Sequence, residues 1–113
     1  MESEGKYEDA FTMYIDALSY KPGHRDLRIA IGKVYRLLGD NEKSIEIFND
    51  LLLRSPRSAE LNLEIAKSYY ADRARNKALK HIETSLDVWK NADAIYKPAI
   101  EARARWAEWN QVN

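Results

Sequence analysis

The feature that most constrains this chain is an internal period of 34 residues. When the sequence is shifted against itself by 34 places, six classes of position keep their size and polarity. They are Gly5 with Gly39, Ala10 with Ser44 and Ala78, Tyr14 with Phe48 and Ile82, Leu18 with Leu52 and Leu86, Pro22 with Pro56, and Tyr35 with Tyr69. A period of this length indicates a small structural unit used several times, whose copies stack and share their buried faces.

Apolar residues within a unit recur at the spacing of one helix face. Ile31, Val34 and Leu38, for example, lie three or four places apart, which places them on one side of an α-helix. The pattern predicts six helices, over residues 6–20, 25–38, 41–54, 59–72, 75–88 and 93–109. Pro22 and Pro56 are expected to end the second helix of their units, because the residue before a proline is disfavoured in helical geometry.

The expected helix ends carry capping residues. Asp26 and Asn41 are predicted to cap helix amino termini, and Gly39 to cap a carboxyl terminus. Arg73 stands one period after Gly39, and arginine accepts a positive φ less readily than glycine does. We therefore expect the turn over residues 71–74 to be built differently, or the helix before it to run longer.

The period and its residue types resemble the tetratricopeptide repeat, a helix–turn–helix unit with the pattern W-x2-L-G-x2-Y, then A-x3-F, then P. The middle unit reads Arg28-x2-Ile31-Gly32-x2-Tyr35, then Ser44-x3-Phe48, then Pro56. The next unit reads Asn62-x2-Ile65-Ala66-x2-Tyr69, then Ala78-x3-Ile82, with Lys90 at the proline position. The tryptophan of the pattern is missing from both full units, but the resemblance covers nearly the whole chain.

The resemblance implies an all-α fold, an α-solenoid of stacked antiparallel helix pairs with about six helices. We expect residues 1–113 to form a single domain, made of a half repeat (5–22), two full repeats (25–58 and 59–92) and a carboxy-terminal capping helix (93–109). Small residues, Gly32 and Ala66, are expected to let paired helices approach closely. The larger Phe48 and Ile82 are expected to fill the space beside them.

The first expected helix lacks the partner helix that precedes it in a full unit, and its apolar side carries Phe11, Tyr14 and Leu18. We favour a chain that is a fragment of a longer protein and acts as a protein-interaction scaffold; an accessory or regulatory domain of that protein is an alternative. The alternative is that a second copy covers this side, which predicts self-association and a homo-oligomer. At the other end, Trp106 and Trp109 are expected to pack as a cap on the stack.

The resemblance also implies where a partner binds, because the first helices of such pairs line an inner, concave groove. The residues at the matching positions are Ile29, Lys33, Arg36, Leu37, Leu63, Lys67, Tyr70, Lys97 and Arg105. They predict an exposed apolar strip, including Ile29 and Leu63, flanked by cations and suited to a peptide or partner protein with acidic residues. The alternative is that they are ordinary solvated side chains on a helix surface.

Composition argues against several other functions. Eighteen basic residues balance eighteen acidic ones, and the chain has no cysteine, so we expect no nucleic-acid partner, thiol chemistry or cysteine-bound metal. His24 and His81 are interpreted as surface residues without neighbouring ligands. We expect no enzyme activity, no cofactor or metal, no membrane insertion, and a cytoplasmic location if Met1 is the natural start.

Overall fold

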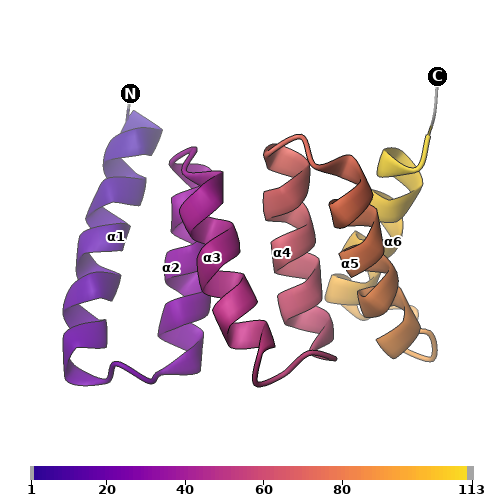
Figure 1. Ribbon diagram of the computed structural model, residues 1–113, viewed down its shortest axis with the longest axis horizontal. Coiled ribbons are helices and arrows are strands. Elements are labelled where there is room, and N and C mark those ends of the chain that lie inside the picture. Colours follow the sequence, from indigo (N-terminus) through magenta and orange to yellow (C-terminus); the bar gives the residue numbers. More distant parts are fainter. Residues whose placement is uncertain (1, 112–113) are drawn as a thin grey trace.

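The computed structural model describes residues 2–111 and confirms the all-α prediction (Figure 1). Over this range the chain forms six helices and no strand. The helices are α1 (Glu2–Tyr20), α2 (Arg25–Leu37), α3 (Asn41–Leu52), α4 (Ala59–Ala71), α5 (Arg75–Val88) and α6 (Lys97–Trp109).

The helices stack in chain order as a series of antiparallel neighbours, from left to right in Figure 1. In Figure 1 they run from α1 at one edge to α6 at the other, with α2 behind α3 and α6 behind α5. Each helix packs on the next one along the chain, and α2 also packs on α4. We call α2, α4 and α6 the first helices, and α1, α3 and α5 the second helices. The molecule measures 39 × 30 × 26 Å.

Close approach of α2 and α3 depends on Gly32, as the sequence predicts. The ring of Phe48 lies directly on this glycine, because a Cβ atom added to Gly32 would stand only 2.7 Å from the ring's Cζ atom. Phe48 is fully buried. One period later, Ala66 and Ile82 occupy the same positions in one buried cluster. The pairing of a small residue with a large one is therefore repeated along the stack.

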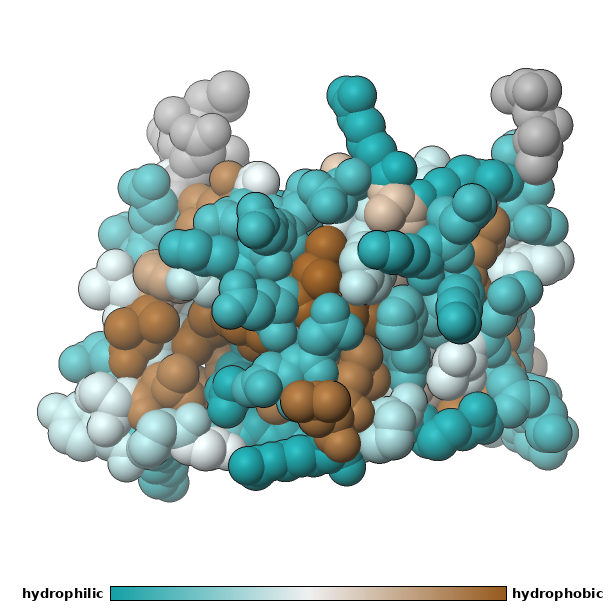
Figure 2. All heavy atoms as spheres, viewed as in Figure 1, coloured by the Kyte–Doolittle hydropathy of each residue, from teal (hydrophilic) through white to brown (hydrophobic). Residues whose placement is uncertain are grey.

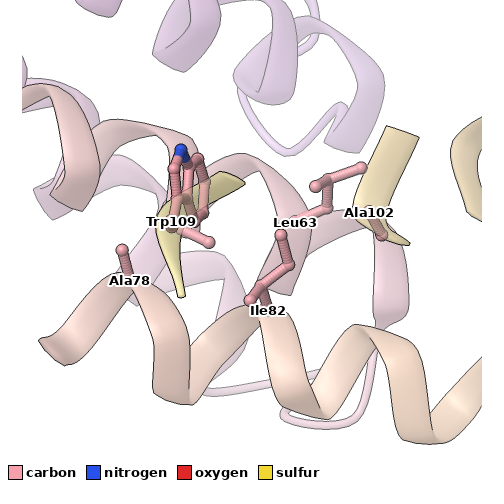
Figure 3. Packing of buried hydrophobic residues seen from close by; sticks show 6 residues of the cluster. Leu63, Ala78, Ile82, Ala102 and Trp109 are labelled. Atoms are coloured by element: carbon pink, nitrogen blue, oxygen red, sulfur yellow. The ribbon is translucent and has the colours of Figure 1, made fainter. Parts of the chain in front are cut away.

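Helix α4 is the centre of the hydrophobic core. One buried cluster joins it to α5 and α6 and contains Leu63, Ala66, Ala78, Ile82, Ala102 and Trp109 (Figure 3). The other joins it to α2 and α3 and contains Ile29, Phe48, Leu52, Leu61 and Ile65. Since α4 has neighbours on both sides, it buries residues around most of its circumference. Trp109, expected to pack on the stack, is 2% exposed and stacks on Tyr70 with ring centroids 4.5 Å apart.

Two of the predicted helix caps are wrong by one or two residues. Helix α3 is capped by Asp40, whose carboxylate accepts a hydrogen bond from the Lys43 amide at 3.2 Å. Helix α2 is capped by His24, whose Nδ1 atom accepts from the Leu27 amide at 3.3 Å. Asn41 and Asp26 lie just inside these helices, where Asp26 still places negative charge near the positive end of the helix dipole.

The last helix begins at Lys97, four residues later than predicted. Pro98 has no amide hydrogen and cannot join the hydrogen-bond ladder, so it is tolerated only in the first turn. A helix from residue 93 would place Pro98 beyond that turn. Asp93 instead forms a turn in which its backbone oxygen accepts from the Tyr96 amide at 2.9 Å. As a result Ile95 lies before the helix and is 80% exposed.

The turn at Arg73 was predicted to differ from the turn at Gly39, and that prediction is wrong. Gly39 has φ +89° and Arg73 has φ +64°, both in the left-handed region. The amide of Gly39 donates to the Arg36 oxygen at 3.0 Å, and the amide of Arg73 donates to the Tyr70 oxygen at 3.0 Å. Arginine accepts the strain because the helices packed on either side of the turn require this geometry.

Replacing Arg73 by glycine is therefore expected to stabilise the protein. A left-handed conformation costs a residue with a Cβ atom about 1–2 kcal/mol, and part of the gain is lost to the greater flexibility of glycine in the unfolded chain. We expect a net gain of about 0.5–1 kcal/mol in the free energy of unfolding, measured by denaturant titration. Gly39→Ala is the matched control and should lose stability. A loss in Arg73→Gly would contradict the interpretation.

Candidate partner-binding surface

The nine predicted groove residues all lie on the first helices, but they divide into three groups by exposure. Lys33, Leu37, Tyr70 and Lys97 are exposed, and Arg36, Lys67 and Arg105 are partly buried. Ile29 and Leu63 are only 5% and 3% exposed. The expectation that these two apolar residues face solvent is wrong, because each is a member of a core cluster.

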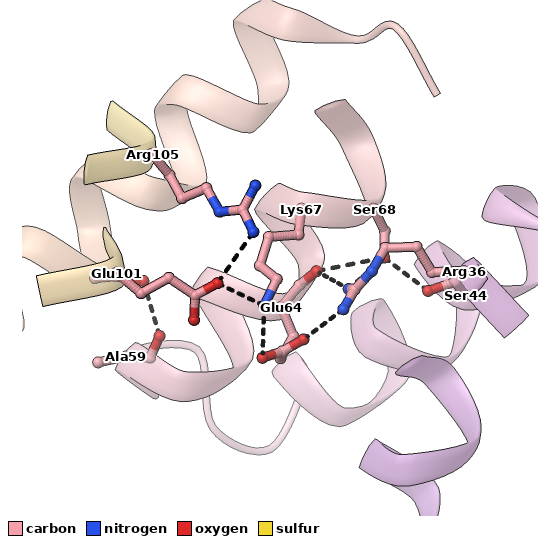
Figure 4. Close-up of polar contacts among 9 residues, drawn as sticks. Arg36, Ser44, Ala59, Glu64, Lys67, Ser68, Glu101 and Arg105 are labelled. Carbon is pink, nitrogen blue, oxygen red and sulfur yellow. Dashed lines mark hydrogen bonds and ion pairs between the residues drawn. The ribbon is translucent and has the colours of Figure 1, made fainter. Parts of the chain in front are cut away.

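The partly buried cations belong to a chain of ion pairs that crosses α2, α4 and α6 (Figure 4). Arg36 Nη2 contacts Glu64 Oε1 at 2.9 Å, and Lys67 Nζ contacts the other oxygen of Glu64 at 3.5 Å. Lys67 Nζ also contacts Glu101 at 2.9 Å, and Glu101 contacts Arg105 at 3.4 Å. The side chains of Arg36 and Glu64 are only 12% and 8% exposed. We call these five residues the charge network.

Hydrogen bonds connect the charge network to the helix layer beneath it. Arg36 Nη1 donates to the backbone oxygen of Glu64 at 3.0 Å and to Ser68 Oγ at 3.2 Å. Ser68 Oγ lies 2.7 Å from Ser44 Oγ on α3, and both serines are fully buried. One guanidinium therefore links α2 to α4 and, through two hydroxyl groups, to α3. Buried polar groups that are all satisfied in this way favour one arrangement of the helices.

The charge network keeps Glu101 ionised. Burial alone would raise the pKa of this carboxyl. Contact with the Lys67 ammonium and the Arg105 guanidinium lowers the pKa by more than burial raises it, so the pKa of Glu101 lies below its usual value. Three of the cations predicted for ligand binding, Arg36, Lys67 and Arg105, thus have carboxylate partners inside the chain.

The sequence contained a signal for the pairing of Lys67 with Glu101. Glu101 lies 34 residues after Lys67, and equivalent positions on stacked first helices are neighbours.

Lys33, in contrast, makes no ion pair with any of the described residues. It borders an open hollow of about 360 Å³ between α1 and α2. Apolar and charged side chains both line the hollow, and Asp26 and Glu60 add two carboxylates to it. Its lining residues are Tyr14, Asp26, Ile29, Ala30, Lys33, Val34, Leu37 and Glu60.

Of the three residues predicted for self-association, Phe11 packs on α2, and Tyr14 and Leu18 are only partly buried. The Phe11 ring meets the Tyr35 ring of α2 edge to face, with centroids 4.9 Å apart. Tyr14 borders the hollow, and Leu18 is partly buried. The exposed apolar residues of α1 lie elsewhere on the helix; they are Met13 (70%), Ile15 (42%) and Tyr20 (80%).

A second hollow, of about 960 Å³, lies over α2 and α3. Glu42, Glu46 and Asp50 are exposed along its edge, and Asp50 pairs with Arg28 at 2.7 Å. Hydrophobic atoms are visible in the left and central parts of the molecular face in Figure 2, and hydrophilic atoms cover most of the right part. The exposed carboxylates of Glu42, Glu46 and Asp50 are those of a solvated helix face.

His81 is not a surface residue, contrary to the prediction. Its ring is partly buried, stacks on Tyr69 with centroids 5.5 Å apart, and places Nδ1 2.9 Å from Asn62 Oδ1. The amide nitrogen of Asn62 donates to the backbone oxygens of Pro56 and Ser58. This fixes Asn62 Oδ1 as an acceptor, so Nδ1 of His81 carries the hydrogen. Burial first, and the charge of Lys80 second, lower the pKa of His81.

The lowered pKa of His81 predicts a loss of stability in mild acid. The unfolded chain takes up the proton near the ordinary value of 6.5, before the folded chain does. The contribution is therefore complete above this pH and decreases as the pH falls through it. Denaturant titrations at about pH 7.5 and about pH 5.5 should show this decrease, because most carboxyl groups titrate lower. His81→Gln should show a smaller decrease, and equal decreases in both proteins would contradict the interpretation.

Two absences hold for the part of the chain that the structure covers. No cluster of three or more histidine, aspartate or glutamate side chains is arranged to bind a metal ion. None of the six helices combines the length and apolar character that crossing a membrane requires.

Comparison with known proteins gives one family and several distant relatives. Residues 2–63 match the family model of the tetratricopeptide repeat. The chain is 25% identical over 84 residues to human protein O-mannosyl-transferase TMTC1, covering 74% of this chain and 10% of that protein. It is 28% identical over 78 residues to the Saccharomyces cerevisiae anaphase-promoting complex subunit CDC16, covering 66% and 9%. It is 27% identical over 105 residues to the photosystem I assembly protein Ycf3 of Rippkaea orientalis, covering 88% and 56%. The chain thus spans only part of each relative's length.

Proposed function

Because the chain belongs to the tetratricopeptide repeat family, we propose that it is a protein-interaction module that binds a segment of a partner protein on its first helices. The family generally mediates contacts between proteins. Two of the relatives are named as a complex subunit and an assembly protein, which agrees with a role of this kind. The proposed role is binding and involves no catalysis.

The proposal is supported by a row of exposed side chains on the first helices. These are the predicted groove residues that neither belong to the charge network nor lie in the core. Leu37 and Tyr70 are 50% and 39% exposed and supply apolar contacts. Lys33 and Lys97 are exposed cations on α2 and α6 and would steer an acidic segment toward the surface. Arg36 and Lys67 are assigned to the charge network and hold the surface in shape. The binding surface is thus narrower than the nine residues of the sequence prediction.

A short labelled peptide that alternates glutamate with leucine would test this proposal. Lys33→Glu and Lys97→Glu are each expected to weaken binding by roughly three- to tenfold, the order expected when a surface attraction becomes a repulsion. They should also reduce the dependence of affinity on salt. Lys80→Glu on α5 makes the same charge change away from this surface and is the control. Equal weakening by all three variants would show only non-specific attraction.

Self-association through α1 is a competing candidate, favoured by the 70% exposure of Met13 and by the partly exposed Tyr14. Sedimentation velocity at several protein concentrations distinguishes the two candidates. A dimer that dissociates in a Met13→Glu variant would support self-association, and a monomer throughout would reject it.

A further inference from the structure

A pocket of about 350 Å³ lies where α2 begins and α3 ends. Its lining comes from these two helices and from the connections beside them, and none of the lining residues belongs to α1. Both connections, α1 to α2 and α3 to α4, lie at the lower edge of the molecule in Figure 1. The lining residues are Gly23, Arg25, Arg28, Asp50, Leu51, Leu53, Arg54 and Ser55. We call this site the arginine pocket.

The arginine pocket has an excess of positive charge, because its lining includes three arginines and one carboxylate, that of Asp50. Asp50 Oδ2 contacts Arg28 Nη2 at 2.7 Å. Arg25 is only loosely paired, since its Nη1 atom lies 3.9 and 4.0 Å from the nearest carboxylate oxygens. Arg54 forms no ion pair with any residue that the structure describes. Two guanidinium groups are thus available to an anion, and guanidinium groups match the geometry of a phosphate.

The same pocket is lined by a serine whose hydroxyl is free to react. Ser55 is partly buried, and its hydroxyl is not among the serine hydroxyls that form hydrogen bonds over residues 2–111. Its neighbours on both sides, Arg54 and Pro56, are exposed and lie outside the helices. Pro56 also disfavours helical geometry at Ser55. An exposed, non-helical segment with proline directly after a serine is the kind of segment that a proline-directed protein kinase modifies.

We propose that Ser55 is a phosphorylation site and that Arg25 and Arg54 bind its phosphate in the arginine pocket. The kinase supplies the phosphoryl group from ATP. The Ser55 oxygen forms a bond to the terminal phosphorus, the bond from this phosphorus to the ADP oxygen breaks, and the hydroxyl proton passes to a carboxylate of the kinase. A phosphoserine carries a charge of about −1.5 to −2 at neutral pH, which suits a lining with more cations than carboxylates.

The bound phosphate would connect three parts of the stack. Arg25 begins α2, Arg54 follows the end of α3, and Ser55 lies in the connection to α4. Arg25 Nη2 already donates to Ser58 Oγ, the cap of α4, at 3.2 Å. A phosphate placed opposite arginines orders the loop in which it lies. Phosphorylation would therefore stiffen the junction between the two full repeats, and this effect does not depend on partner binding by the first helices.

Protein with phosphoserine incorporated at position 55 tests the arginine pocket. Its melting temperature should lie roughly 2–6 °C above that of the unmodified protein, and the gain should decrease as salt is added. Arg54→Gln should remove about half of the gain or more, since it removes one of two phosphate ligands. Arg103→Gln, which removes an exposed arginine of α6, is the matched control and should leave the gain unchanged. Phosphoserine in place of the exposed Asn91, between α5 and α6, should give no gain.

The titration of the phosphate is a readout that a change in folding alone does not produce. The second pKa of phosphoserine is ordinarily about 6, and neighbouring guanidinium groups lower it because they favour the more highly charged form. Phosphorus NMR should show a pKa at position 55 that is lower than at position 91 by roughly 0.5 or more. Arg54→Gln should raise it again. Equal pKa values at the two positions would overturn the proposed phosphate binding.

Phosphoryl transfer is tested on the folded protein with a proline-directed kinase, ATP and Mg²⁺. Mass spectrometry of proteolytic fragments should locate the phosphate on Ser55, and Ser55→Ala should abolish it. A synthetic peptide of residues 50–60 is the positive control for the kinase. Modification of the peptide but not of the folded protein would overturn the proposal, because Ser55 would then be out of reach. Modification of neither, or of Ser58 in place of Ser55, would overturn it as well.

Discussion

Glu64→Ala is expected to destabilise the protein by about 3–5 kcal/mol, the usual cost of removing one partner from a buried ion pair. The carboxylate of Glu64 contacts both Arg36 and Lys67, and its side chain is 8% exposed. Its loss leaves the Arg36 guanidinium, only 12% exposed, without its carboxylate partner. Much of the cost is the desolvation of an uncompensated charge rather than the loss of attraction.

Denaturant titration measures this change, and two further variants interpret it. Glu46→Ala removes an exposed carboxylate from α3 and should change stability by less than about 0.5 kcal/mol. The double variant Arg36→Met with Glu64→Leu should recover most of the loss, because it removes both charges of the buried pair. A loss below about 1 kcal/mol in Glu64→Ala would mean that the pair is effectively solvated.

Gly32→Leu is expected to destabilise the protein by roughly 3 kcal/mol, at the upper end for overpacking. Even a Cβ atom at this position would stand 2.7 and 2.9 Å from two carbons of the Phe48 ring. Phe48 is fully buried and has little room to move. Either the ring leaves its rotamer or α2 and α3 separate, and both loosen the core.

The second full repeat, residues 59–92, suggests a rescue for this site. Ala66 and Ile82 show that alanine is accepted when the opposing residue is isoleucine. Gly32→Ala should therefore be unfavourable alone and less unfavourable, or favourable, when combined with Phe48→Ile. Thermal unfolding of the two single variants and the double variant gives the coupling energy. Strictly additive effects would contradict direct contact between the two residues. A gain from Gly32→Ala alone would show that helix propensity outweighs the overlap.

The sequence alone determined the repeat, the pairing of helices, and the small-against-large contact of Gly32 with Phe48. These features depend on period and side-chain size, which return every 34 residues. The capping turn at Gly39 followed in the same way, because glycine has an intrinsic preference for positive φ.

Only the tertiary structure decided which groove positions are exposed. Ile29 and Leu63 have the right spacing for an open surface, but neighbouring helices bury them. Lys67 is paired with Glu101 because α4 and α6 come together in space. Arg73 adopts a positive φ because the helices on either side hold it there. Burial, ion pairing and backbone strain depend on how far neighbouring helices approach, and a one-dimensional pattern does not contain that distance.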